Sequence, residues 1–200
     1  MKTDMLEDRA EHQRPRVLKA AWRDRPPGLD EFREAFRLHP SGVAVITGSV
    51  NGLPVAMTVS SLISVSAEPP FVIFSLSKQS YATQQLMQTD SVIAHLLNSD
   101  YKWLAELGAR GNADRFEDRN LWHTIPSGEP VYRGVPAWLR LSVVDRTEVG
   151  SAIVCIAQVL HIELSLDEGE QSPLVYHSRN WHRLTEASVI DETTGRNVRG

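Results

Sequence analysis

Hydroxyl side chains are densest in one short stretch of the chain, which reads MTVSSLISVS. They belong to Thr58, Ser60, Ser61, Ser64 and Ser66. A strand with this composition could bind a polar ligand, because each hydroxyl can both donate and accept a hydrogen bond. It could also be a half-exposed strand whose Ser and Thr residues face water. The segment alone favours the second interpretation.

A second group of polar side chains lies where the segment FVIFSLS gives way to KQSYATQQL. The group comprises Ser77, Lys78, Ser80 and Thr83. Where a strand hands over to a helix, the first backbone N–H groups of the helix are free and its dipole favours an anion. Hydroxyls and a lysine would add donors for a phosphate there. An ordinary helix capped by Ser80 explains the same residues equally well.

One further cation stands in the segment GNADRF. Arg115 could clamp a phosphate through two parallel N–H bonds. It could instead pair with Asp114 or Asp118 at the surface. Each of these three segments is a weak signal when it is taken alone.

Several familiar catalytic patterns are missing from the sequence. It contains no glycine-lysine phosphate loop, no glycine-rich dinucleotide turn, no HExxH pair and no GxSxG elbow. Cys155 is the single cysteine, which excludes a cysteine-rich zinc site. No catalytic side chain can therefore be assigned, and an enzyme of this kind would depend on a borrowed cofactor.

Four histidine and glutamate positions could suggest a metal, but simpler interpretations are available. His161 and Glu163 share one face of an expected strand, and a solvated face explains them better than a metal pair. His177 and His182 lie near Trp181, where such residues are more typical of a strand edge or a cofactor lining. We therefore expect no metal site.

Composition narrows the class of protein. The chain has 200 residues, of which 42% are hydrophobic and 23% charged, and these values are ordinary for a globular domain. The formal net charge of -4 argues against nucleic acid as a partner. No apolar run reaches the ~20 residues that a membrane span needs, and the N-terminus lacks a secretory signal pattern. Together with the single cysteine, these features predict a cytoplasmic protein with no membrane partner.

The chain divides into an arm, a domain and a tail. Residues 1–28 form an expected N-terminal arm, partly flexible, which ends in Pro26, Pro27 and Gly28. Within it a weak amphipathic helix could use Leu6, Val17, Leu18 and Trp22. Residues 29–185 form the expected domain, and residues 186–200 a polar tail.

The pattern within the domain is mostly strands. Short helices are expected at 31–40, with Phe32 and Phe36 at helical spacing, and at 81–90 and 100–112. Strands are expected at 42–49, 55–66, 71–77, 91–98, 137–149, 151–164 and 173–177. Asn51-Gly52 predicts a tight hairpin turn, since both residues tolerate positive φ. Several strands with turn signals and short helices favour a mainly β, antiparallel barrel.

The order of these segments resembles the flavin reductase-like family, the small reductases that feed reduced flavin to two-component monooxygenases. The resemblance runs from about Phe32 to Leu184, and SSLISVSAEPPFVIFSLSK is its most specific stretch. It implies a split antiparallel β-barrel with Greek-key strands, assembled as a homodimer. It also implies FMN, with FAD as the alternative, near the subunit interface, and NAD(P)H as co-substrate.

The resemblance also implies which residues contact the flavin. Along the ring and ribityl chain it places Thr58, Val59, Ser60 and Ser61. Near the ribityl chain and phosphate it places Ser75, Ser77, Lys78, Ser80, Thr83 and Arg115. From the C-terminal strand and its sequel it adds Tyr176, Trp181 and His182.

Two departures from the family pattern bear on the activity. Family members carry Gly-Asp-His at the start of the penultimate strand, where this chain has Gly150, Ser151 and Ala152. Family members also usually have a phenylalanine followed by an alanine where this chain has Gly108 followed by Ala109. We expect the loss of both rings to open the space above the flavin.

The leading interpretation is an NAD(P)H:flavin reductase that supplies reduced FMN to a partner monooxygenase. A flavin enzyme acting directly on a small organic substrate in an enlarged pocket is the first alternative. A flavin-binding protein without turnover is the second.

Overall fold

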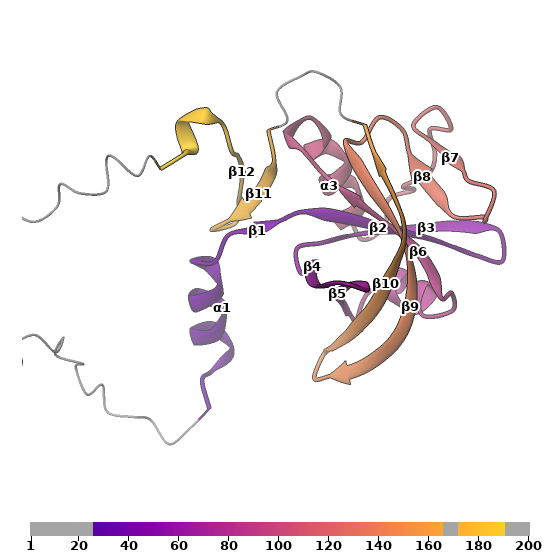
Figure 1. Cartoon of the computed structure of the whole chain (residues 1–200). Coiled ribbons are helices and arrows are strands. Elements are labelled where there is room, and N and C mark those ends of the chain that lie inside the picture. Colours follow the sequence, from indigo (N-terminus) through magenta and orange to yellow (C-terminus); the bar gives the residue numbers. More distant parts are fainter. Residues whose placement is uncertain (1–25, 166–171, 191–200) are drawn as a thin grey trace, which may run out of the picture. The chain divides into compact units, whose positions relative to one another are not determined.

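The computed structural model describes residues 26–165 and 172–190 of the chain (Figure 1). The predictions for residues 1–25 and 191–200 therefore lie outside the described residues. Internal contacts divide the chain into two units, residues 1–35 and 36–200. Among the described residues, no helix is both long and apolar enough to span a bilayer.

Helix α1 (Leu29–Arg37) confirms the first predicted helix. Its beginning is stabilised by the backbone N–H of Gly28, which donates to Oε2 of Glu31 at 2.8 Å. This bond has the form of the returning half of a capping box. Acidic residues in the first turn and Arg37 in the last turn suit the helix dipole.

The hairpin of β2 (Ala44–Val50) and β3 (Leu53–Val59) confirms the turn predicted at Asn51-Gly52. Val50 faces Leu53 across the hairpin, and the two turn residues have φ of 51° and 77°. Positive φ at both central positions gives a twist that matches the flanking strands.

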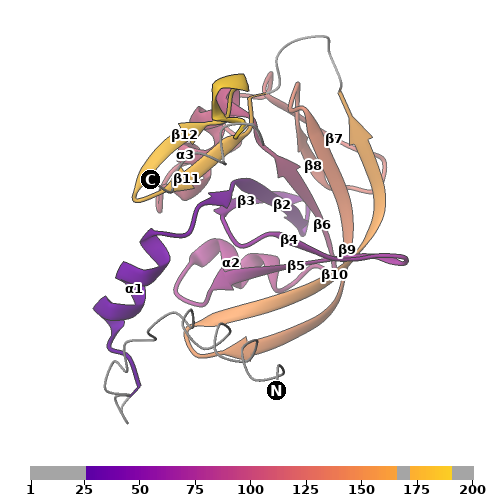
Figure 2. The same cartoon turned by 60° about the vertical axis from the view of Figure 1, so that its left-hand side comes forward.

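Seven antiparallel strands form the main sheet, in the order β3-β2-β6-β9-β10-β5-β4. The other strands are β6 (Ser91–Leu96), β9 (Ala137–Val149), β10 (Ala152–Leu164), β5 (Pro70–Ser77) and β4 (Ile63–Ala67). Register shifts interrupt the β9–β10 pairing at Ile156/Ala157 and Val159/His161. Such bulges bend a strand, and Figures 1 and 2 show β9 and β10 curving strongly.

The curved sheet brings β3 back toward β5. The hydroxyl of Ser61, just after β3, accepts from the backbone N–H of Ser75 at 2.9 Å and lies 3.2 Å from the Ser75 carbonyl. This mainly β fold with antiparallel sheets confirms the fold class that the sequence predicts.

Strand β2 is buried on both faces. Ile46 packs into a cluster with Val92, Leu141 and Phe74 inside the curved sheet. Val45, on the opposite face, packs into a second cluster under the surrounding helices and loops. Burial on both sides explains why GVAVITG is nearly continuous in its apolar residues rather than alternating.

The remaining elements cover the sheet. They are α2 (Tyr81–Leu86), the 3-10 helix η1 (Ser99–Tyr101), α3 (Lys102–Ala109), β7 (Trp122–Thr124) and β8 (Pro130–Tyr132). A separate three-stranded sheet joins β1 (Ser41–Gly42), β11 (Leu174–His177) and β12 (Asn180–Arg183), and the 3-10 helix η2 (Glu186–Ser188) follows it.

Several details differ from the sequence prediction, which expected no strand between residues 112 and 137, where the structure has β7 and β8. The expected strand 55–66 is interrupted, because β3 ends at Val59 and β4 begins at Ile63 on the opposite edge of the sheet. The hydroxyl-rich stretch thus comprises the end of β3, a crossing at residues 60–62 and most of β4. Strand β12 was missed, because NWHR is only four residues long and has little apolar character.

Candidate functional site

Two adjoining cavities lie where β3 ends, and we call them together the β3 groove. One, of about 290 Å³, is lined by Val43, Thr58, Ser60, Ala109, Tyr176, Arg179 and Trp181. The other, of about 300 Å³, is lined by residues 57–61, 75–77 and 152. Both cavities share Thr58 and Ser60, so the hydroxyl-rich end of β3 forms the wall between them.

The alternation of β3 explains which side chains reach the groove. Val59 is buried in the core cluster, whereas Thr58 is partly exposed and Ser60 exposed. The Thr58 hydroxyl donates to the carbonyl of Ala105 in α3 at 2.6 Å, which fixes its rotamer. Ser60 follows the end of the strand, where backbone N–H groups are no longer committed to the ladder.

Eight of the predicted flavin contacts meet in the groove. They are Thr58, Val59, Ser60, Ser61, Ser75, Ser77, Tyr176 and Trp181. The Ser61 hydroxyl is engaged with the backbone of Ser75, so its direct role is to join the two walls. The hydroxyls of Ser60 and Ser77 are on exposed residues and are better placed to meet a ligand.

The predicted phosphate contacts around α2 do not line the groove. The Nζ of Lys78 pairs with Oε2 of Glu148 at 2.6 Å, and this exposed carboxylate competes with any phosphate. Ser80 is the residue before α2, but its hydroxyl makes no capping bond. Thr83 is 1% exposed, and its hydroxyl contacts the sulfur of Met57 in the core. Thr83 is thus turned away from both cavities, because the first turn of α2 packs that side chain inward.

Arg115 holds the end of helix α3. Its guanidinium donates to the carbonyls of Gly108 at 3.3 Å and Ala113 at 3.4 Å, and also to that of Arg110. A cation is favoured there by the free carbonyls and the helix dipole. Arg115 also lines a separate cavity of about 130 Å³ with Tyr81 and Ala82 of α2. The structure therefore brings Arg115 beside the start of α2, although its donors are already engaged.

The hairpin of β11 and β12 contributes the aromatic wall. The rings of Tyr176 and Trp181 lie 4.8 Å apart between centroids, and both line the groove. His182 lies on the other face of β12, where its Nε2 is 3.3 Å from the carbonyl of His177. Strand alternation separates His182 from Trp181, so the structure does not bring that predicted contact to the groove.

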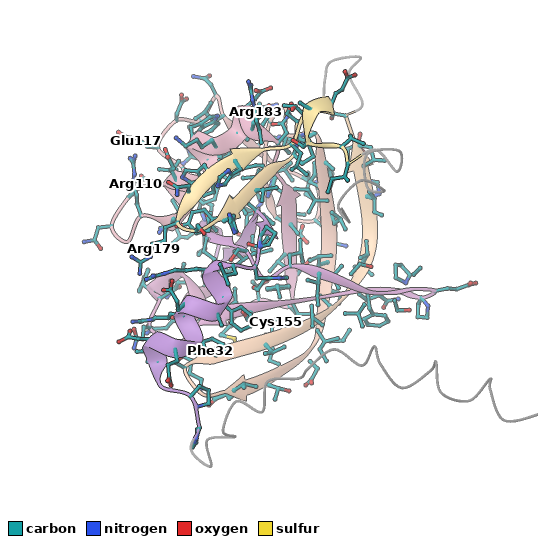
Figure 3. All side chains as sticks on the ribbon, turned by 90° about the vertical axis from the view of Figure 1, so that its left-hand side faces the viewer. Phe32, Arg110, Glu117, Cys155, Arg179 and Arg183 are labelled. Carbon is teal, nitrogen blue, oxygen red and sulfur yellow. The ribbon has the colours of Figure 1, made fainter. Side chains whose placement is uncertain are left out.

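Sequence reasoning missed Arg179. This residue occupies the turn between β11 and β12 and lines the groove (Figure 3). It has a positive φ of 63°, next to Ser178 with φ 50°. Two polar residues between PLVYH and NWHR could have signalled a tight hairpin, had NWHR been read as a strand.

The expectation that Gly108 opens the space above a flavin is wrong. A Cβ on Gly108 would stand 2.4 Å from Oγ1 of Thr58 and 3.1 Å from its backbone nitrogen. Gly108 is required because α3 approaches β3 closely, and no ring fits there. Ala109 and Ala152 do line the groove. The small side chain of Ala152 therefore lies at the candidate site, where the sequence predicted extra space.

The residues of the β3 groove fit a flavin. Its two cavities together are within the usual size of a cofactor pocket. The hydroxyls of Ser60 and Ser77 can hydrogen-bond a ligand, and Trp181 and Tyr176 offer it aromatic surface. Only Arg179 and Tyr176 are ionisable among the lining residues, so the groove offers little acid–base chemistry of its own.

Comparisons with known proteins place the chain in a family. Residues 36–185 match the model of the flavin reductase like domain, and the chain belongs to this family. A relative named NADH:FMN oxidoreductase, from Rhodococcus qingshengii, is 36% identical over 156 residues, covering 78% of this chain and 81% of that one.

Two further matches agree with this assignment. The reductase component of a 4-nitrophenol 4-monooxygenase/4-nitrocatechol 2-monooxygenase from Rhodococcus opacus is 27% identical over 165 residues, covering 82% of this chain and 86% of that one. The crystal structure of a flavin reductase domain protein from Arthrobacter sp. FB24 superposes with a TM-score of 0.74 at 30% identity. It covers 80% of this chain and 97% of that one.

Proposed function

We propose that this protein is an NAD(P)H-dependent flavin reductase that binds FMN in the β3 groove. The observation that carries the proposal is the groove itself, in which hydroxyls, aromatic rings and one arginine meet without an acid–base pair. The match to an NADH:FMN oxidoreductase supports FMN over FAD and NADH as the reductant.

The chain's own residues would bind and orient rather than transfer protons. When bound, a flavin supplies an acceptor for the hydride of a reduced nicotinamide, a reaction that requires alignment more than acid or base. Ser60 and Ser77 would hydrogen-bond the ligand, and Thr58 holds the end of β3 in place through Ala105. Trp181 and Tyr176 would exclude water from one side of the groove.

We include the assembly in the proposal. The edge strand β4 exposes Ile63 and Val65, and the end of β10 exposes Leu160, Ile162 and Leu164. Apolar side chains on strand edges of a soluble domain are best covered by another chain. A homodimeric split barrel, working in the cytoplasm with a partner monooxygenase, accounts for these surfaces and for the relative from a two-component system.

The test is NADH oxidation by the purified protein with and without added FMN. We expect NADH consumption that depends on both protein and flavin, together with a dimer in light scattering. Consumption that is unchanged when FMN is omitted or when the protein is heat-denatured would contradict the reductase.

Ala152 favours one second candidate, a flavin enzyme that acts directly on an organic substrate. The family's histidine position is occupied by this small side chain, which lines the groove. If this candidate holds, FMN stays bound through gel filtration and NADH fails to reduce it. In the reductase, by contrast, Ala152→His should raise the rate of NADH oxidation.

A further inference from the structure

The positive charge of the β3 groove comes from a residue outside the predicted phosphate contacts. Arg179 is the only charged side chain among those that line the two cavities. Lys78 is paired with Glu148, and the guanidinium of Arg115 holds three carbonyls at the end of α3. Neither of these cations lines the groove.

The guanidinium of Arg179 has no competing partner within the part of the chain that the structure describes. No carboxylate lines either cavity, so nothing in the groove neutralises this charge. An arginine that lines a hydroxyl-bearing groove, with no carboxylate among the other lining residues, can offer its donors to an anion. A phosphate suits it best, because the planar fork matches two phosphate oxygens.

The backbone at Arg179 supports a functional role. Ser178 and Arg179 both have positive φ, as a two-residue hairpin turn requires. Glycine and asparagine adopt this conformation at little cost, whereas a long side chain is disfavoured. A residue in a disfavoured conformation that lines a cavity is the kind of outlier from which function can be inferred.

We propose that Arg179 recognises a phosphate group of the ligand bound in the β3 groove. The inference rests on the proposed function, because FMN and the nicotinamide nucleotide both carry phosphate. Thr58 and Ser60 stand between Arg179 and the half of the groove lined by Ser77 and Ala152. Arg179 thus acts from the end of the groove that the aromatic wall encloses.

Arg179→Gly is the sharpest test, since glycine suits φ of 63° and the variant should fold at least as well as the parent. Arg179→Lys keeps the charge but loses the planar fork. Arg183→Ala, on β12 of the same hairpin but outside the groove, is the matched control (Figure 3).

Two measurements distinguish the flavin phosphate from the nucleotide phosphate as the group that Arg179 recognises. Binding of FMN and of riboflavin is measured by fluorescence at low salt, and KM is measured for NADH. If the flavin phosphate is recognised, Arg179→Gly weakens FMN roughly tenfold or more and leaves riboflavin unchanged, the scale of a lost charge-assisted bond. If the nucleotide phosphate is recognised, flavin binding is unchanged and KM for NADH rises tenfold while kcat holds.

In either case the affected constant, the FMN affinity or the KM for NADH, should lie for Arg179→Lys between the values of the parent and of Arg179→Gly. Arg183→Ala should have the parent's values. Added salt should reduce the differences between the variants, because it screens the charge of Arg179. Unchanged FMN, riboflavin and NADH parameters in Arg179→Gly would overturn the proposal, as would equal losses for FMN and riboflavin. If the parent protein itself binds no flavin and oxidises no NADH, the proposed function fails instead.

Discussion

Replacing Gly108 by alanine tests the close approach of α3 to β3 that builds one wall of the groove. The added Cβ would stand 2.4 Å from Oγ1 of Thr58, so that the hydroxyl must move. Its bond to the carbonyl of Ala105, 2.6 Å long, is lost when it does. The backbone nitrogen of Thr58, 3.1 Å away, limits how far the strand can yield.

The expected magnitude combines three contributions. Overpacking costs about 1–3 kcal/mol, and the lost hydrogen bond costs about 1 kcal/mol. Alanine offsets about 1 kcal/mol of this through its better helix propensity. We therefore expect Gly108→Ala to lower the free energy of unfolding by about 2 kcal/mol, where the propensity alone predicts a gain.

Urea denaturation of four proteins measures the effect: the parent, Gly108→Ala, Thr58→Ala and the double variant. Removing Oγ1 of Thr58 relieves the shortest contact, so Gly108→Ala should cost at least about 1 kcal/mol less in the Thr58→Ala background. Gly111→Ala is the control, since a Cβ there meets nothing within 4 Å. Equal costs in both backgrounds, or a stabilised Gly108→Ala, would refute the reasoning.

Two further predictions concern polar side chains that are hydrogen-bonded within the fold. Burial lowers the pKa of His95 to about 4, so the unfolded chain binds a proton below its ordinary pKa of 6.5 while the folded chain does not. Stability should then fall by about 3 kcal/mol as the pH drops from above 6.5 to 4, and His95→Leu should lose this part of the pH dependence in urea titrations. Arg115→Ala should lower the free energy of unfolding by about 1–3 kcal/mol, because carbonyls at the end of α3 lose their donor. If calorimetry instead shows that Arg115→Ala binds FMN more weakly while the free energy of unfolding is unchanged, the main role of Arg115 is to bind the phosphate and not to cap α3.

The role of His95 illustrates what the sequence conceals. Its Nε2 accepts from the backbone N–H of Tyr132 at 3.0 Å, and its Nδ1 lies 3.0 Å from the carbonyl of Val45. The ring is therefore neutral, with its proton on Nδ1, and joins β2, β6 and β8. Nothing in SVIAHLLN indicates a histidine that is fully buried, because both partners are distant in sequence.

Local signals predicted most of the fold. The Asn51-Gly52 turn was enough to predict the β2–β3 hairpin. The alternation of apolar residues predicted β9 and β10 with nearly the bounds that the structure shows. The hydroxyl-rich stretch was harder, because the break after Val59 depends on β4 pairing with β5 across the sheet.

The resemblance, and not composition, placed Thr58, Ser60 and Ser77 at a ligand site, and all three line the groove where β3 and β5 end. The contacts that depend on pairing between distant residues were missed. Lys78 forms an ion pair with Glu148, which is 70 residues away in the sequence. No local sequence pattern indicates this pairing. Arg179 reaches the groove through a hairpin whose second strand carries almost no sequence signal.

Anaerobic stopped-flow mixing of the FMN-loaded protein with NADH tests the central claim most directly. If the β3 groove aligns a nicotinamide with a bound flavin, the oxidised flavin absorbance bleaches in a single phase faster than steady-state turnover, at a rate that saturates with NADH. Flavin that stays bound and oxidised throughout the turnover time, with NADH and with NADPH alike, would contradict the account.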